Sequence, residues 1–147
     1  MQMTIIRHIL EVKGHDLWCT SPEASVYDAL RMMSDKDVGA LVVMEGEKMV
    51  GIMSERDYAR KVVLLGKTSR ETKVSEIMSK TVYTVHPDQT VEEAMELMNS
   101  KRIRHLPVMA DENSSQVLGM ISIGDVVKAI IYKQREAIKG LEDRMRS

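Results

Sequence analysis

Apolar and polar positions alternate along this chain in a pattern that predicts short strands separated by helices. Apolar side chains at helical spacing predict a helix over residues 25–36. Two apolar runs, 40–44 and 49–53, surround a polar Glu-Gly-Glu-Lys segment and predict a hairpin. A strand at 16–20 and a helix at 57–65 complete the set, so the order is strand, helix, strand, strand, helix.

The second half of the chain has the same order of elements. After a polar linker at 66–73, the predicted elements are a strand at 83–85, a helix at 91–101, strands at 105–109 and 117–121, and a helix from Asp125 to about Arg144. Strands and helices that alternate in this way predict an α/β fold.

The last predicted helix carries apolar side chains at coiled-coil spacing. They recur at alternating steps of four and three residues, with one glutamine in the series: Val127, Ile131, Gln134, Ile138, Leu141 and Met145. A contact between two copies of the chain and a helix packed on its own domain both fit this spacing.

One seven-residue pattern occurs in both halves and indicates a duplicated unit. Residues 51–57 read Gly-Ile-Met-Ser-Glu-Arg-Asp and residues 119–125 read Gly-Met-Ile-Ser-Ile-Gly-Asp, so the offset is 119 − 51 = 68. The preceding helix and middle strand match at an offset of 65, and the three extra residues lie in the polar stretch 111–115. We therefore expect a first repeat with its N-terminal segment at 1–68, a second at 69–133, and a helical extension at 134–147.

Composition and charge narrow the classes of function. Of the 147 residues, 29% are charged and 44% apolar, and the net charge is −1 with acids and bases interspersed, so we expect no nucleic-acid partner. No apolar run approaches the ~20 residues that span a bilayer, and the N-terminus has no secretory signal pattern. The single cysteine, Cys19, forms no internal disulfide, which fits a reducing compartment. We expect a cytoplasmic protein that binds no membrane.

The Ser-x-x-Asp element of the repeated pattern has two interpretations. It matches a capping box, in which the serine caps a helix and the acid answers the serine's backbone N–H. Ser54 and Asp57 in one copy, and Ser122 and Asp125 in the other, also stand where a predicted strand runs into a helix. An ionised carboxylate accepts hydrogen bonds only, so an aspartate there suits the two hydroxyl groups of a ribose.

Cationic side chains precede the second copy of the pattern, whereas evidence for catalysis is lacking. Arg104 and His105 stand at the entry of a predicted strand, and Arg56 lies within the first copy. The planar guanidinium group of arginine suits phosphate.

The four histidines show no metal-ligand spacing and no nucleophile motif is present, so we expect neither an enzyme nor a metal site.

Together, the doubled pattern, the strand entries and the order of elements resemble the cystathionine β-synthase (CBS) domain family. The resemblance covers residues 5–133 and is to a stand-alone tandem pair, a Bateman module. It implies two β-α-β-β-α repeats packed as a pseudo-twofold pair, with two clefts between the repeats. It also implies an adenosine-containing ligand: AMP first, with ATP, ADP, NAD(H) and S-adenosylmethionine as further members of the class.

The resemblance assigns site residues by position. In one cleft, Asp125 and Ser122 would hold the ribose and Arg104 and His105 the phosphate, and the adenine side would come from His15, Asp16, Val38 and Gly39. The other cleft would use Ser54, Arg56, Asp57, Lys80, Thr81, Val82 and Ile103. Because Gly39 and Ala40 stand where the second repeat has Arg104 and His105, we expect unequal sites, with the Asp125 site better suited to phosphate.

These features predict a regulatory sensor of energy or redox state. Nucleotide in the clefts would favour one arrangement of the protein, and an unidentified partner would respond to that arrangement. The resemblance also implies a homodimer. Two other classes of function remain open: a protein interaction module without a physiological nucleotide, and a small enzyme acting on a nucleotide.

Overall fold

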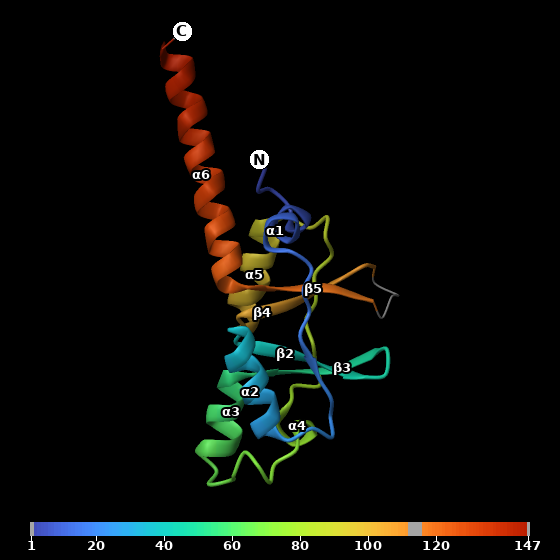
Figure 1. Ribbon diagram of the computed structural model, residues 1–147. Coiled ribbons are helices and arrows are strands. Elements are labelled where there is room, and N and C mark those ends of the chain that lie inside the picture. The colour runs from blue at the N-terminus through green and yellow to red at the C-terminus, as the bar shows by residue number, and fades with distance from the viewer. Residues whose placement is uncertain (1, 112–115, 147) are drawn as a thin grey trace. The chain divides into compact units, whose positions relative to one another are not determined.

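The structure, a computed structural model, describes residues 2–111 and 116–146. Its elements, in chain order, are α1 (Ile6–Lys13), β1 (Cys19–Thr20), α2 (Val26–Lys36), β2 (Ala40–Glu45), β3 (Lys48–Ser54), α3 (Glu55–Tyr58), the π-helical segment η1 (Ala59–Val63), α4 (Val74–Ile77), α5 (Val91–Lys101), β4 (His105–Met109), β5 (Val117–Ser122) and α6 (Ile123–Arg146) (Figure 1). The predicted α/β class is confirmed. The sequence places the three extra residues of the second repeat in the stretch 111–115, and residues 112–115 of that stretch lie outside the described residues.

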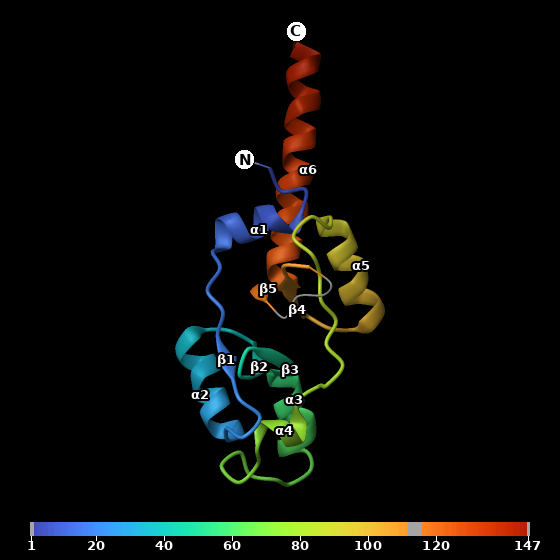
Figure 2. The same cartoon turned by 90° about the vertical axis from the view of Figure 1, so that its right-hand side faces the viewer.

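The chain divides into two compact units. Residues 16–83 form the first unit, and residues 1–15 together with 84–147 form the second (Figure 2). These units differ from the repeats expected at 1–68 and 69–133, because the helix before each repeat packs with the other repeat. Helix α1 lies in the unit that holds α5, β4 and β5, and helix α4 lies in the unit that holds α2, β2 and β3.

Equivalent backbone hydrogen bonds hold each of these two helices against the repeat to which it does not belong in sequence. At the start of α1, the Ile6 N–H donates to the Gln89 carbonyl over 2.9 Å. At the start of α4, the Val74 N–H donates to the Ala24 carbonyl, also over 2.9 Å. Ile6 and Val74 are both fully buried, so each helix adds apolar surface to the core of its unit. The matching apolar spacing before the two repeats therefore marks two equivalent core helices.

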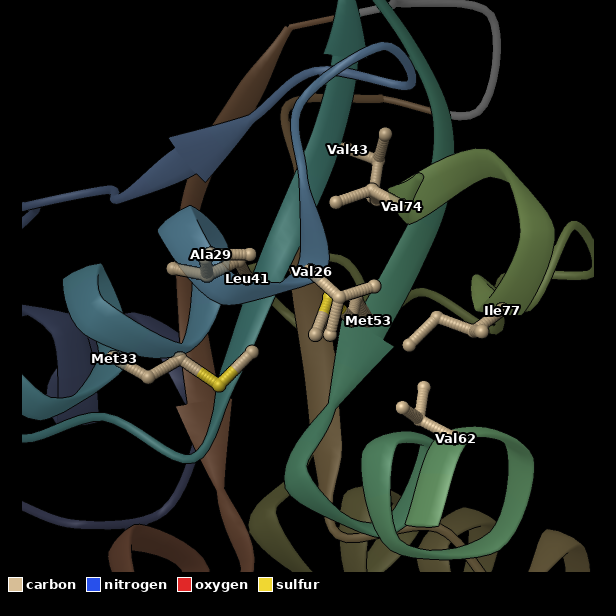
Figure 3. Close-up of a cluster of buried hydrophobic side chains, with 9 residues drawn as sticks. All are labelled: Val26, Ala29, Met33, Leu41, Val43, Met53, Val62, Val74 and Ile77. Atoms are coloured by element: carbon tan, nitrogen blue, oxygen red, sulfur yellow. The ribbon is translucent and has the colours of Figure 1, made fainter. Parts of the chain in front are cut away.

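The first unit is built on a three-stranded sheet in the order β1-β2-β3. Strand β1 is parallel to β2, and β2 is antiparallel to β3. Helices α2, η1 and α4 contribute to a buried apolar cluster with the two longer strands, and Figure 3 shows its side chains: Val26, Ala29, Met33, Leu41, Val43, Met53, Val62, Val74 and Ile77. The helical spacing predicted for 25–36 thus corresponds to a buried face of α2.

The second unit has a two-stranded antiparallel sheet, β4-β5, where the sequence predicts a third strand at 83–85. That prediction is wrong: in this segment Val85 makes only an isolated parallel bridge to Val108. The bridge is the counterpart of the pairing of Thr20 with Val43 in the first unit. Pro107 has no backbone N–H to donate and stands where the first unit has Val42, so the ladder cannot extend.

Both helices that follow the repeated pattern begin earlier than predicted. The helix expected at 57–65 begins at Glu55 and becomes π-helical at Ala59, and the helix expected from Asp125 begins at Ile123. In each case the pattern serine directly precedes the helix, so its aspartate lies in the first turn. None of the helices in the described ranges combines the length and apolar character needed to cross a bilayer.

Candidate functional site

The aspartate of the second pattern copy is fixed at the junction of β5 and α6. The backbone N–H of Ser122 donates to the Asp125 carboxylate Oδ2 over 2.8 Å, and the Asp125 N–H donates to the Ser122 hydroxyl over 3.2 Å. This reciprocal pair is a capping box and satisfies N–H groups at the start of the helix. The capping interpretation of the motif is therefore confirmed for this copy.

The first copy forms the same capping box at the junction of β3 and α3. Asp57 Oδ2 accepts from the Ser54 N–H over 2.9 Å and from the Ser54 hydroxyl over 3.0 Å, and the Asp57 N–H donates back to that hydroxyl over 3.2 Å. Both carboxylates are thus held rigidly at the exit of a strand. Capping and ligand binding are compatible, because each carboxylate has two oxygens and several acceptor positions.

The two carboxylates receive their cations from different parts of the chain. Lys13, the last residue of α1, places its Nζ 2.7 Å from Asp125 Oδ2 and donates to the Met120 carbonyl, also over 2.7 Å. Asp57 has Lys61 instead, with Nζ 3.4 Å from Oδ1, and Lys61 donates to the Ile77 carbonyl over 2.9 Å. The aspartates match, but their counter-ions do not.

Neither lysine was predicted from the sequence as a site residue, yet the repeat offset contains a signal for Lys13. Position 13 corresponds to position 81, because 81 − 13 = 68, and Thr81 is one of the expected site residues. Applying that expectation to both repeats would have identified Lys13. No comparable signal marks Lys61, whose counterpart at the same offset is Ala129.

The surroundings of Asp125 favour its ionised form. Burial by itself raises the pKa of this carboxyl, but hydrogen bonds from Lys13 and Ser122 and the Lys13 charge outweigh it and hold the pKa below its usual value. The Asp125 side chain is 22% exposed and that of Lys13 39%. The site therefore presents an anionic acceptor, already paired with an ammonium group, that solvent can reach.

Arg104 and His105 lie beside this pair, as the sequence predicts. His105 is directly opposite Ser122 in the β4–β5 ladder, and the Arg104 carbonyl accepts from the Ile123 N–H over 2.8 Å. Burial lowers the pKa of His105, the Lys13 and Arg104 charges lower it further, and Asp125 acts in the opposite sense. One carboxylate thus shares a small region with two basic side chains and a histidine whose pKa is lowered.

The other expected site residues divide between the two units. His15 and Ile103 belong to the second unit, and the His15 ring Nδ1 lies 3.1 Å from the Leu118 carbonyl oxygen. The remaining ones belong to the first unit, with Ser54 and Asp57: Asp16, Val38, Gly39, Arg56, Lys80, Thr81 and Val82. The structure thus brings Ser122, Asp125, Arg104 and His105 together. The predicted partnership of Asp125 with Asp16, Val38 and Gly39 stays a prediction.

Within the first unit, backbone contacts connect two of the expected segments to the strand and helix that meet at the Ser54–Asp57 capping box. The Gly39 carbonyl accepts from the Glu55 N–H over 3.1 Å, which is the counterpart of the Arg104 contact in the second unit. Lys80, Thr81 and Val82 follow Ser79, which forms an antiparallel bridge with Ile52 of β3. Because Gly39 carries no side chain where the second unit has Arg104, the difference between the two strand entries is present in the structure.

Comparison with known families gives two matches along this chain. The model of the CBS domain matches residues 9–64 and 74–132, one match to each repeat. Among curated proteins, the mitochondrial CBS domain-containing protein CBSX3 of Arabidopsis thaliana is 41% identical over 150 aligned positions, which cover 95% of this chain and 71% of that protein.

Two solved structures extend the comparison to the fold. The crystal structure of the CBS domain protein NE2398 superimposes with a TM-score of 0.81 at 43% identity, over 86% of this chain and 97% of that one. The CBS domain pair of protein MJ0100, solved in complex with 5′-methylthioadenosine and S-adenosyl-L-methionine, has a TM-score of 0.75 at 23% identity, over 88% of this chain and 98% of that one.

Proposed function

Because the chain belongs to the CBS domain family and carries two copies of the domain, we propose that it is a regulatory protein that binds a phosphorylated adenosine ligand at Asp125. The observation that carries this proposal is the ionised Asp125 carboxylate at the exit of β5, with Lys13, Arg104 and His105 beside it. AMP is the ligand we expect first, ahead of ADP, ATP and NAD(H).

The chemistry of the site supports a ribose with an attached phosphate. The Asp125 carboxylate accepts hydrogen bonds and donates none, which suits a pair of adjacent hydroxyl groups. Lys13 and Arg104 supply positive charge within the same region, and phosphate is the ligand group that such charges favour. The MJ0100 complex supports adenosine compounds as ligands of this fold, whereas the choice of ligand here rests on the chain's own residues.

The regulatory part of the proposal is supported by the contacts that the described site residues already make. Asp125 is committed to a helix cap, and Lys13 to an ion pair and a carbonyl, so we assign neither as an acid, base or nucleophile. A ligand that binds one arrangement of the protein better than another shifts the population toward it by no more than its difference in affinity. We propose that an unidentified cytoplasmic partner responds to this shift.

A homodimer is the assembly we propose, and α6 supports it. Apolar side chains at coiled-coil spacing are exposed along this helix: Val127, Ile131, Ile138, Leu141 and Met145. The same exposed face favours a second candidate function, a protein interaction module that uses no nucleotide. The two functions differ in a single requirement, which is binding of an adenosine ligand.

Thermal melting of nucleotide-free protein tests the proposed function. AMP, ATP, NADH and S-adenosylmethionine are added separately, and a specific ligand at about 100 times its Kd should stabilise the fold by about 2.7 kcal/mol. Loss of the shift in Asp125→Asn, with the shift retained in Asp57→Asn, would assign the response to the Asp125 site. If none of the four compounds raises the Tm of the wild-type protein, the interaction module is the better account.

A further inference from the structure

Lys13 is bonded to one oxygen of the carboxylate that a ribose would need. Its Nζ lies 2.7 Å from Asp125 Oδ2, the oxygen that also accepts the Ser122 N–H. A carboxylate oxygen has only two lone pairs, so this oxygen is filled when both donors are in place. A ribose that binds both carboxylate oxygens through its two hydroxyl groups therefore competes with the Lys13 ammonium group for Oδ2.

The position of Lys13 is set by the helix that carries it. The start of α1 is tied to the second unit by the Ile6 N–H, and Ile9 and Leu10 are buried in the core of that unit. Lys13 also donates to the Met120 carbonyl over 2.7 Å, so the ammonium group keeps one partner if it leaves Asp125. A displaced ammonium group thus stays in the site, without the anion that had balanced its charge.

We propose that Lys13 makes the Asp125 site select phosphorylated nucleotides over adenosine compounds without a phosphate. This inference rests on the proposed function and adds a residue that determines the class of ligand. A ribose alone breaks the Lys13–Asp125 ion pair and offers the ammonium group no anion in return. A 5′-phosphate restores a charge-assisted hydrogen bond to Lys13 and lies beside the Arg104 charge as well. A sulfonium ligand would add positive charge to a region that already has an excess.

The Asp57 site provides the internal comparison. Lys61 approaches Asp57 at Oδ1 over 3.4 Å, a looser contact than that of Lys13, and Oδ2 carries the capping hydrogen bonds. Lys61 also lies one helical turn beyond Asp57 and not on the helix that precedes the repeat. Of the two sites, the Asp125 site is the one in which the lysine lies close to the carboxylate and shares the oxygen that carries the capping hydrogen bond.

The test is calorimetric titration of nucleotide-free protein with AMP and with adenosine. In Lys13→Met, removal of the competing ammonium should raise adenosine affinity, while AMP affinity should fall about tenfold, the usual worth of one charge-assisted hydrogen bond. Lys13→Arg retains the charge and should retain the preference for AMP. Two variants serve as controls: Arg7→Met, which breaks the α1 ion pair to Asp88, and Lys133→Met, which breaks the α6 ion pair to Glu92. Both should leave the ratio of the two affinities unchanged.

The outcomes separate the inference from the proposed function. Opposite changes for AMP and adenosine in Lys13→Met, with neither control doing the same, would support the inference. If AMP and adenosine both weaken by the same factor, Lys13 does not select for phosphate and the inference is overturned, while the proposed function stands. If the wild-type protein binds neither compound at millimolar concentration, both are overturned.

Discussion

At the scale of single residues, the two Ser-x-x-Asp motifs show how one side chain can serve folding and function together. Asp57 and Asp125 both complete a capping box, which alone accounts for a serine and an acid at this spacing. What distinguishes the two sites is their neighbours: Lys13 contacts one carboxylate and Lys61 the other. The strand entries differ as well, with Arg104 beside His105 in one unit and Gly39 in the other. The motif predicts the cap, and the neighbours decide which ligand the site suits.

The glycine that opens each motif should tolerate a methyl group unequally. A Cβ on Gly51 would lie 2.8 Å from Met78 Sδ and 2.9 Å from the Ser79 carbonyl oxygen, and backbone hydrogen bonds between Ser79 and Ile52 fix that carbonyl. Among residues 2–111 and 116–146, a Cβ on Gly119 would meet only the Leu10 Cδ2 methyl, at 3.1 Å. Gly51→Ala should therefore cost about 1–3 kcal/mol of stability and Gly119→Ala less. Urea unfolding of both variants measures this difference, and an equal or larger cost for Gly119→Ala would contradict it.

His105 should make stability depend on pH near neutrality. Burial and the Lys13 and Arg104 charges lower its folded-state pKa, whereas Asp125 opposes them, and the unfolded value is about 6.5. Around that pH and down to the folded-state pKa, the unfolded chain therefore binds more protons than the folded chain, so the free energy of unfolding should fall as pH falls through this range. Above about pH 7 the contribution should be constant.

Denaturant unfolding of the wild type and of His105→Gln, measured at steps of about one pH unit between about pH 5 and pH 8, tests this pH dependence. The variant should lose the part of the slope that His105 contributes. An identical slope in the wild type and the variant would show that this histidine titrates alike in the folded and unfolded chain. Bound AMP should raise the pKa of His105, because a phosphate adds negative charge beside it.

At the scale of elements, apolar periodicity predicts most of the fold, and its failures have local causes. The helix at 91–101 and the strand at 105–109 have the predicted bounds. The strand at 83–85 fails because Pro107 withholds a backbone donor, which is a property of the neighbouring strand and not of the segment itself. The match between the segments around Ile6 and Val74 is visible in the sequence, but their exchange between repeats depends on tertiary packing.

Helix α6 should mediate self-association through its exposed apolar face. The later turns of α6 continue past β4 and β5 of the same unit (Figure 1), and Ile138 and Leu141 are each 56% exposed there. Ile138→Glu should convert a dimer into a monomer, because it places a charge in the apolar row. The matched control is Lys139→Glu, on the same turn but outside the row. Sedimentation velocity measures both, and a monomeric wild-type protein, or a dimer that survives Ile138→Glu, would contradict the assignment.

At the scale of the whole molecule, duplication is the feature that the sequence predicts most directly. The two copies differ in the residues near their aspartates, and this difference determines which ligand each site suits. The CBS domain model matches the chain twice, which confirms a tandem pair of these domains. Comparison of the two repeats predicts that Arg104 and His105 belong to the Asp125 site and have no basic counterparts in the first repeat. The structure adds Lys13 to the Asp125 site. Lys13 escaped prediction because it stands before the first repeat in the sequence, whereas the fold packs α1 in the unit that contains Asp125 of the second repeat.

The central claim is that Asp125 anchors a phosphorylated adenosine ligand, and calorimetric titration of AMP into nucleotide-free protein tests it most directly. The account predicts binding to the wild-type chain that is lost or weakened at least about tenfold in Asp125→Asn, since a hydrogen bond to a charged group is removed. Asp57→Asn, which alters the equivalent capping aspartate, should retain that binding. Undiminished AMP affinity in Asp125→Asn, or no binding of AMP to the wild-type chain, would contradict it.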